Sequence, residues 1–342
     1  MPAAIPTATA PWPTRRLGRS AISVGILGLG TATMGGSRIP LTRPDREALV
    51  RAAWDSGIRY VDTAPFYGVG AAEHAVGDAL RDEPRDAWVL SSKVGRLLRP
   101  DPVGAPSPDG RLAPLPFTVA YDYSHDGILR SAEDSLQRLG LARIDILYVH
   151  DIGAYQHGEA AAAHMRVLRE SGYRALARLK AEGSIGAIGI GVNETAVLME
   201  ALRWGEWDAF LLAGRYTLLE QAPLDDLLPL CAARGVSIVV GGPLNSGLLA
   251  GRDSWNYAPA PAAMAARARA IGAVCDRHGV PLPAAALQFP LAHPVVASVI
   301  PGPRSAAEFT ENLGLMRRAI PADLWAELKR EGLLRPDAPV PG

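Results

Sequence analysis

The chain has 342 residues, 48% hydrophobic and 20% charged, a composition typical of a folded globular protein. Its 35 basic residues balance 35 acidic ones, so it lacks the broad positive field that non-specific nucleic-acid binding requires. No stretch approaches the roughly 20 apolar residues that span a bilayer, and the Pro-rich start lacks the apolar core of a secretory signal. We therefore expect a cytoplasmic protein with no nucleic-acid or membrane partner.

Short apolar runs rich in β-branched residues alternate with Ala- and Arg-rich segments of helical period. The runs predict eight strands, at 24–31, 58–63, 87–92, 144–150, 187–192, 209–213, 236–240 and 297–300. The segments between them predict helices at 43–56, 72–81, 125–139, 164–182, 194–204, 223–234 and 261–278. This alternation predicts a parallel eight-stranded (β/α)8 TIM barrel, with a doubly wound open sheet as the alternative.

Three segments exceed a minimal barrel. Residues 16–24, with a turn at Gly18, predict an N-terminal hairpin that closes the barrel bottom, and 284–294 and 322–332 predict extra C-terminal helices. Residues 97–124 form a Pro-, Gly- and Asp-rich insertion, and a loop of this length is usually functional or disordered. No linker interrupts the composition, so we expect one domain over 15–335 after a flexible segment, 1–14.

Several chemistries are disfavoured. The run from Gly28 to Thr33 superficially suggests a dinucleotide fingerprint, but Thr33 stands where the third glycine is needed and no helix follows at once. The P-loop and Gly-x-Ser-x-Gly patterns are absent, and two cysteines cannot form a disulfide framework. His157 and His164 fit solvated positions better than a metal site, so no metal is expected.

Polar residues occur at the carboxyl ends of three neighbouring predicted strands, the rim that carries the active site in this architecture. Asp62 ends the second strand, Lys93 follows the third and His150 ends the fourth. Tyr67 lies close enough to Asp62 to reach the same point. Each residue alone would more often be structural, as an ion pair or a buried histidine, but the four together predict a site.

The four side chains predict proton transfer. A phenol titrates near 10, and an adjacent ammonium lowers its pKa, so Lys93 is expected to tune Tyr67 while Asp62 holds Lys93 in place. His150 is expected to bind the oxygen of Tyr67 or of the substrate. This set offers a proton donor and acceptor but no nucleophile, and hydride exchange with a nicotinamide needs only such a set.

The sequence resembles the aldo/keto reductase superfamily over nearly its whole length. The motifs VDTAPFYG, VLSSKVG, IDILYVHD and SVIPGPRS occur in the family's order, at 61–68, 89–95, 144–151 and 298–305. The resemblance implies a (β/α)8 barrel that uses NAD, with NADP as the alternative. It also implies that Asp62, Tyr67, Lys93 and His150 are the catalytic tetrad, with Tyr67 as the general acid/base.

The coenzyme side departs from the family's common pattern. Only Asn193 remains of the Ser-Asn pair after the fifth strand, and Ala213 and Gly241 stand where a glutamine and a ring-stacking aromatic are expected. The resemblance assigns these further positions to the coenzyme: Gly30, Thr31, Asp62, Pro243, Leu244, Ser246, Gly247, Gly302, Arg304, Ser305, Glu308 and Asn312. NAD is expected over NADP because the Glu308 carboxylate would repel a 2′-phosphate, although Arg304 is able to bind one.

The runs VVGGPLNSG, IGIGVNE and 121–145 resemble the branch of D-threo-aldose 1-dehydrogenases, or L-fucose dehydrogenases, and pyridoxal 4-dehydrogenases. That branch oxidises ring hemiacetals to lactones, which implies an aldose substrate such as L-fucose or D-arabinose. Pyridoxal oxidation, general aldehyde reduction and a cofactor-binding regulatory subunit are the alternatives.

The expected substrate contacts are Tyr67 and His150, joined by three aromatic residues of the insertion, Phe117, Tyr121 and Tyr123. The insertion leaves the third strand beside Lys93, so we expect it to help form the substrate pocket. The alternative is a disordered surface loop, and the oligomeric state is left open.

Overall fold

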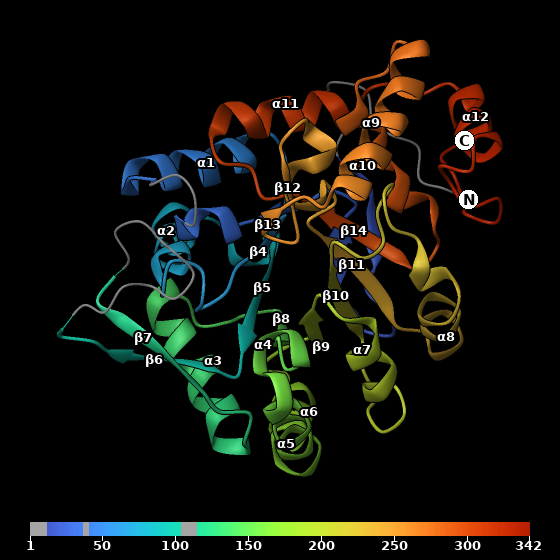
Figure 1. Ribbon diagram of the computed structural model, residues 1–342. Helices are drawn as coiled ribbons and strands as arrows, with labels where there is room; N and C mark the ends of the chain where they lie inside the picture. The colour runs from blue at the N-terminus through green and yellow to red at the C-terminus, as the bar shows by residue number, and fades with distance from the viewer. Residues whose placement is uncertain (1–11, 37–40, 104–114) are drawn as a thin grey trace.

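The computed structural model describes residues 12–36, 41–103 and 115–342. Its centre is an eight-stranded parallel sheet in the order β3-β4-β5-β8-β9-β10-β11-β14. These strands are β3 (Leu29–Gly30), β4 (Tyr60–Asp62), β5 (Val89–Val94), β8 (Ile146–His150), β9 (Ala187–Val192), β10 (Ala209–Ala213), β11 (Ser237–Gly241) and β14 (Val296–Ile300). A bridge between Leu27 and Val299 joins the two edges, so the sheet closes into the predicted TIM barrel (Figure 1).

Helices surround the barrel (Figure 1). The longer ones are α1 (Arg43–Asp55), α2 (Ala71–Leu80), α3 (His125–Leu139), α5 (Ala161–Val167), α6 (Tyr173–Ala181), α7 (Thr195–Ala201), α8 (Leu227–Arg234), α9 (Ala262–Arg277), α10 (Leu282–Gln288), α11 (Ala306–Met316) and α12 (Ala322–Arg330). Shorter turns are η1 (Ala32–Gly35), η2 (Arg85–Ala87), α4 (Ala154–His157), η3 (Gly158–Ala160), η5 (Ala222–Leu224), η6 (Asn245–Ala250) and η7 (Phe289–Ala292).

The ends of α3 show how local sequence sets these bounds. The Ser124 side chain accepts a hydrogen bond from the N–H of Gly127, and Gly140 ends the helix in the left-handed conformation. The predicted helix 164–182 is divided into α5 and α6 by a π-helical turn, η4 (Leu168–Gly172). A Cβ at Gly172 would lie 2.1 Å from the carbonyl oxygen of Tyr123, so glycine permits this close approach.

The first predicted strand is two strands. β2 (Ser23–Gly25) pairs antiparallel with β1 (Thr14–Arg16), and only β3 enters the barrel. The Gly18 N–H donates to Ser237 Oγ at 2.7 Å, at the amino end of β11, so the hairpin covers the barrel bottom as predicted.

The expectation of a flexible start at 1–14 is wrong for its last residues. Trp12 is buried beneath the Arg317 guanidinium, whose carbon lies 4.9 Å from the ring centre, and Thr14 belongs to β1. Burial of an indole favours one fixed conformation here. Residues 1–11 lie outside the described residues.

Both ends of the predicted insertion 97–124 form a hairpin rather than a loop. β6 (Arg96–Pro100) pairs antiparallel with β7 (Phe117–Tyr121), with Arg96 opposite Tyr121 and Pro100 opposite Phe117. This hairpin projects from the barrel at the left of Figure 1, and residues 104–114 lie outside the described part. A second small hairpin joins β12 (Ser254–Trp255) to β13 (Ala258–Pro259).

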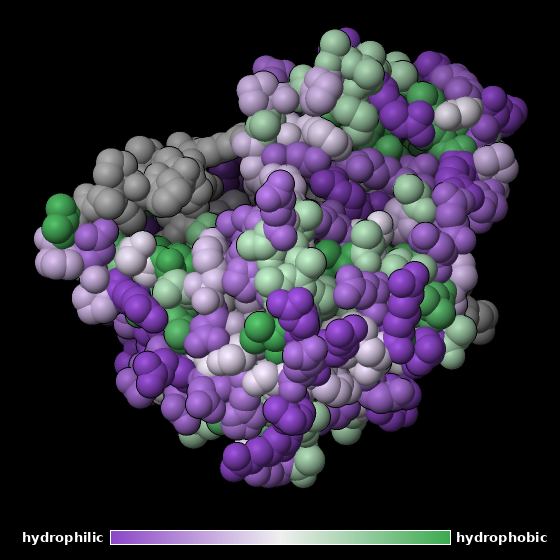
Figure 2. Space-filling model, turned by 60° about the horizontal axis from the view of Figure 1, so that its bottom comes forward, coloured by the Kyte–Doolittle hydropathy of each residue, from purple (hydrophilic) through white to green (hydrophobic). Residues whose placement is uncertain are grey.

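The core has two parts. Inward-facing side chains such as Tyr60, Tyr148 and Leu211 fill the barrel, and a larger cluster lies between strands and helices. On the face in Figure 2, apolar side chains gather only in small groups among polar ones. Within the described ranges, no helix is long and apolar enough to cross a membrane.

Candidate active site

Asp62 and Lys93 form a buried ion pair at the carboxyl ends of β4 and β5. Lys93 Nζ donates to Asp62 Oδ2 at 2.7 Å and to the Thr63 carbonyl at 3.0 Å, and both charged side chains are about 97% buried. Ser91 Oγ donates to the other carboxylate oxygen at 2.7 Å. Two charges this deep are stabilised only because each has close partners, so the ammonium is held in one position.

Tyr67 and His150 complete the predicted group of four. The Lys93 ammonium lies 4.6 Å from the centre of the Tyr67 ring. The His150 ring meets the Tyr67 ring edge-on, with 5.9 Å between their centres. The structure therefore brings together all four residues that the strand ends predicted.

The pKa of Tyr67 moves opposite to the sequence-based expectation. Burial raises it to about 12, and the Lys93 ammonium lowers it by less than burial raises it. Burial by itself would lower the pKa of Lys93, but Asp62 and Tyr67 outweigh it, so that pKa lies above its usual value. At neutral pH the phenol therefore holds its proton and the amine stays charged.

A second buried network supports this group from behind and was not predicted. Ser92 Oγ donates to Glu73 Oε1 at 2.7 Å, and Arg138 Nε lies 2.6 Å from Glu73 Oε2. Glu73 is fully buried on α2, between α3 and the strand that carries Lys93. The role of Glu73 depends on its contact with Arg138 of α3, which is distant in sequence, so residue spacing gave no signal for it.

The three aromatic residues predicted to contact substrate lie in different places. Tyr123 is 1% exposed, and its hydroxyl donates to the His150 carbonyl at 2.8 Å, so it is structural rather than a substrate contact. Tyr121 is exposed opposite Arg96, at the barrel end of the hairpin. Phe117 lies four residues farther out, about 13 Å along the strand.

On the coenzyme side, Asn193 connects two strand ends. Its amide donates to the Ala213 carbonyl at 3.0 Å, and its side chain hydrogen-bonds Tyr257, an exposed residue between β12 and β13. Tyr257 was not predicted. It adopts a left-handed φ of 63° after Asn256 at 48°, and such paired conformations are characteristic of tight hairpin turns.

The predicted pyrophosphate loop is a turn with three successive left-handed residues. Asn245, Ser246 and Gly247 have φ of 48°, 59° and 98°. The Asn245 amide donates to the Gly214 carbonyl at 3.1 Å and to Glu220 Oε1 at 2.9 Å. Pro243 is buried just before the turn and Leu244 is half-buried. Asn245 was missed, although asparagine before Ser-Gly is a signal for left-handed backbone.

Glu308, at the start of α11, is paired with two arginines. Its Oε2 accepts from Arg304 Nε at 3.0 Å, and its Oε1 accepts from Arg252 Nη2 at 2.7 Å. Burial raises the pKa of Glu308, but hydrogen bonds from both arginines outweigh this and hold it below its usual range. The Glu308 carboxylate is therefore engaged by both arginines, and Arg252 was missed.

The remaining predicted coenzyme positions surround the junction of β3 and β14. Ser305 caps α11 by accepting from the Glu308 N–H at 3.1 Å, and Asn312 is buried farther along that helix. A Cβ at Gly30 would lie 2.8 Å from the Ile300 carbonyl, and Gly302 lies against Thr33. Thr31 is buried, with its N–H on the Asp62 carbonyl at 3.0 Å.

These residues fit a nicotinamide dinucleotide. Gly241 leaves space at the end of β11, where a Cβ would lie only 3.1 Å from Leu211, and the guanidinium groups and helix amino end beside Ser305 suit phosphate oxygens. Among the described residues, no group of three metal-binding side chains occurs.

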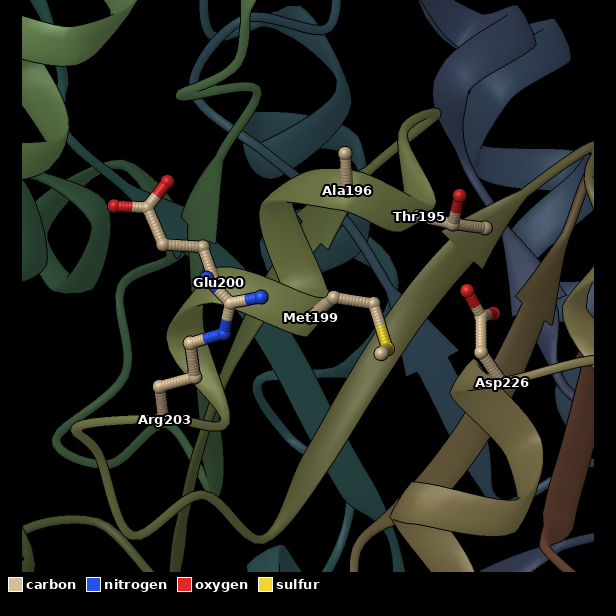
Figure 3. Close-up of a pocket in the computed structure, with 6 residues that line it drawn as sticks. All are labelled: Thr195, Ala196, Met199, Glu200, Arg203 and Asp226. Atoms are coloured by element: carbon tan, nitrogen blue, oxygen red, sulfur yellow. The ribbon is translucent and has the colours of Figure 1, made fainter.

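A surface hollow between α7 and α8 is separate from this site (Figure 3). Its lining residues are Thr195, Ala196, Met199, Glu200, Arg203 and Asp226. None of the four rim residues contributes to it, and several of its side chains face solvent. It therefore plays no part in the candidate active site.

The barrel and its rim residues define a nicotinamide-dependent oxidoreductase, and the chain belongs to the aldo/keto reductase family, whose sequence pattern matches residues 26–331. It is 45% identical over 334 residues to a pyridoxal 4-dehydrogenase of Microbacterium luteolum, covering 94% of this chain and 97% of that one. It is 41% identical over 322 residues to a D-threo-aldose 1-dehydrogenase of a Pseudomonas species, covering 92% and 95%.

Solved structures agree with this assignment. An aldo-keto reductase from Bacillus halodurans in its holo form superposes with a TM-score of 0.71 at 26% identity, covering 93% of this chain and 95% of that one. The resemblance drawn from the sequence motifs is therefore confirmed, and the protein is an NAD(P)-dependent oxidoreductase.

Proposed function

We propose that the enzyme oxidises the C1 hemiacetal of an aldose, such as L-fucose or D-arabinose, to a lactone. The observation that carries this proposal is the buried Asp62–Lys93 pair beneath Tyr67, with Lys93 Nζ 2.7 Å from Asp62 Oδ2. The 41% identity to an aldose 1-dehydrogenase supports the sugar class of substrate. A cytoplasmic location remains a prediction from composition.

Each side chain has one task in this proposal. Tyr67 exchanges a proton with the substrate oxygen, Lys93 stabilises the phenolate when that proton has left, and Asp62 keeps Lys93 in place. His150 binds and orients the substrate oxygen beside the Tyr67 ring. When bound, the nicotinamide supplies the redox chemistry by exchanging a hydride with the substrate carbon.

NAD is the proposed coenzyme. Arg304 and Arg252 are both engaged by Glu308, so a 2′-phosphate would have to compete with an existing carboxylate for the same guanidinium groups. NADP is the alternative, because loss of the contacts to Glu308 would leave the guanidinium groups of Arg304 and Arg252 available to a 2′-phosphate.

Pyridoxal is the second candidate substrate, favoured by 45% identity to a pyridoxal 4-dehydrogenase. Pyridoxal forms an internal hemiacetal, so the same proton transfer at a ring hydroxyl would serve both substrates. A general aldehyde reductase and a cofactor-binding regulatory subunit are the remaining alternatives. The presence of all four rim residues favours an enzyme over a regulatory subunit.

One assay distinguishes these functions. Purified enzyme is given L-fucose, D-arabinose, L-galactose, pyridoxal and simple aldehydes, each with NAD and with NADP. The proposal expects the highest kcat/KM with a sugar and NAD. A higher kcat/KM with pyridoxal would make pyridoxal the substrate in place of a sugar. Coenzyme binding without turnover of any compound would indicate a regulatory subunit.

A further inference from the structure

Asp151 follows His150 directly and turns its carboxylate back toward it. Oδ2 of Asp151 lies 3.3 Å from Nε2 of His150. The backbone of Asp151 is left-handed, with a φ of 43°, and its N–H donates to the Gly191 carbonyl at 2.9 Å. A single non-glycine residue in this conformation is uncommon and is retained where the surroundings determine it.

Arg96 binds the same carboxylate oxygen. Its Nη2 lies 2.6 Å from Asp151 Oδ2, and the arginine side chain is completely buried. The guanidinium carbon lies 4.1 Å from the centre of the Phe66 ring, and Phe66 meets His150 edge-on at 6.0 Å. A permanent cation, a carboxylate and the imidazole of the rim are therefore connected through one oxygen atom.

Other charged and titratable groups around Asp151 come from the neighbouring strands and loops. Lys93 on β5 and Arg96 on β6 lower its pKa, Glu194 after β9 raises it, and burial raises it most, so its pKa lies above the usual value. His157 on α4 and Tyr123 face the carbonyl side of His150, and burial lowers the pKa of His157 to about 4, which leaves it neutral. The Arg96 guanidinium, 2.6 Å from Asp151 Oδ2, favours the charged form of this carboxyl, so Asp151 is the acidic group that faces the imidazole.

We propose that Asp151, held by Arg96, is a positioning residue for His150: its carboxylate accepts a hydrogen bond from the Nε2–H, fixes the orientation of the imidazole and stabilises its protonated form. A carboxylate beside an imidazole has this effect in general. The inference rests on the proposed role of His150 at the substrate oxygen. It does not depend on which substrate is turned over.

The first test is Asp151→Asn, since asparagine has the same size and tolerates left-handed backbone. We expect kcat to fall about tenfold or more while the Kd for NADH, read from fluorescence, stays within twofold. The acid limb of the pH profile should move to lower pH, because loss of the carboxylate disfavours imidazolium. An unmoved limb with unchanged kcat would overturn the proposal.

A double-mutant cycle separates this inference from the proposed function. If Asp151 acts through His150, Asp151→Asn adds no loss to His150→Gln. Losses that multiply would overturn the inference alone. If His150→Gln kept wild-type turnover, the proposed role of His150 would fail, and this inference with it.

Three further variants guard against a folding defect. Arg96→Lys keeps a cation near the carboxylate and should retain more activity than Arg96→Gln, which should weaken turnover most at low pH, where Asp151 becomes protonated. Equal activity of the two variants across the pH range would contradict the proposal. Glu194→Gln is the matched control, because this carboxylate bonds the Tyr155 N–H instead of the imidazole, and its kcat should stay within twofold.

Discussion

The two halves of the barrel rim are built differently. On the acid/base half, Asp62, Lys93 and His150 belong to three neighbouring strands, and their positions follow from strand register. On the half proposed to bind the coenzyme, the side chains belong to loops and a helix start, where the turn at Asn245 and the ion pairs of Glu308 hold them. Groups on strands are fixed by the fold, whereas groups on loops need their own side-chain contacts, and the two halves should respond differently to substitution.

Tyr67→Phe should have the largest effect, and it is confined to the acid/base half. The change removes the proton-exchanging oxygen, a contribution of about 10²–10⁴-fold, so kcat should fall by that factor. The Kd for NADH should not change, because the coenzyme half is untouched. Steady-state kinetics and fluorescence titration measure both, and more than about a tenth of wild-type kcat would remove Tyr67 from this role.

The pH profile tests the Lys93–Tyr67 coupling next. With a Tyr67 pKa of about 12, the phenolate fraction rises about tenfold per pH unit between pH 7 and 10, so kcat/KM for oxidation should rise over that range. Lys93→Met removes the cation that lowers this pKa, so the rise should extend to higher pH and neutral activity should fall. It also leaves Asp62 buried without its ammonium, so Tm should decrease. If the pH profile of Lys93→Met were identical to that of the wild type, Lys93 would not affect the pKa of Tyr67.

Glu308→Gln tests the coenzyme half. It weakens the contacts that engage Arg304 and Arg252, and one charged hydrogen bond is worth about 1.5–3 kcal/mol. The ratio of kcat/KM for NADP to that for NAD should therefore rise about tenfold or more, with kcat unchanged. Adding Arg304→Ala should reverse the gain. If the ratio did not move, neither arginine would contact the 2′-phosphate.

The smallest effect is expected in the insertion, where two tyrosines two positions apart form a matched pair. Tyr121→Phe removes an exposed hydroxyl that accepts from Gln156 Nε2 at 2.9 Å, so KM for the sugar should rise a few-fold while stability stays constant. Tyr123→Phe removes a buried hydrogen bond to the His150 carbonyl. The free energy of unfolding should therefore fall by about 1–3 kcal/mol, and Tm should fall with it. The reverse pattern would place Tyr123, not Tyr121, at the substrate.

The sequence predicted the site residues that lie at strand ends. It did not predict features that depend on burial or on loops distant in sequence. The barrel and the convergence of Asp62, Lys93 and His150 follow from alternation and register alone. The direction of the Tyr67 pKa shift was wrong, because the cost of burying a phenolate is not visible in spacing.

Three further differences have specific causes. Arg252 and Tyr257 lie in a loop whose path back to the rim no local pattern encodes. The single predicted strand 24–31 is two strands, because a continuous apolar run does not show where the chain leaves the hairpin for the barrel. Tyr123 was grouped with Tyr121 by residue type, but it faces the interior.

The hairpin of β6 and β7 has a consequence for how such enzymes diversify. It leaves the barrel at Arg96, beside the residues proposed to transfer the proton, and returns at Tyr121 before α3 begins. Its ladder is separate from the barrel sheet. Insertions or exchanges beyond Pro100 and Phe117 therefore leave the register of every barrel strand unchanged. The length and composition of this appendage are thus uncoupled from the strand positions that bring Asp62, Lys93 and His150 together.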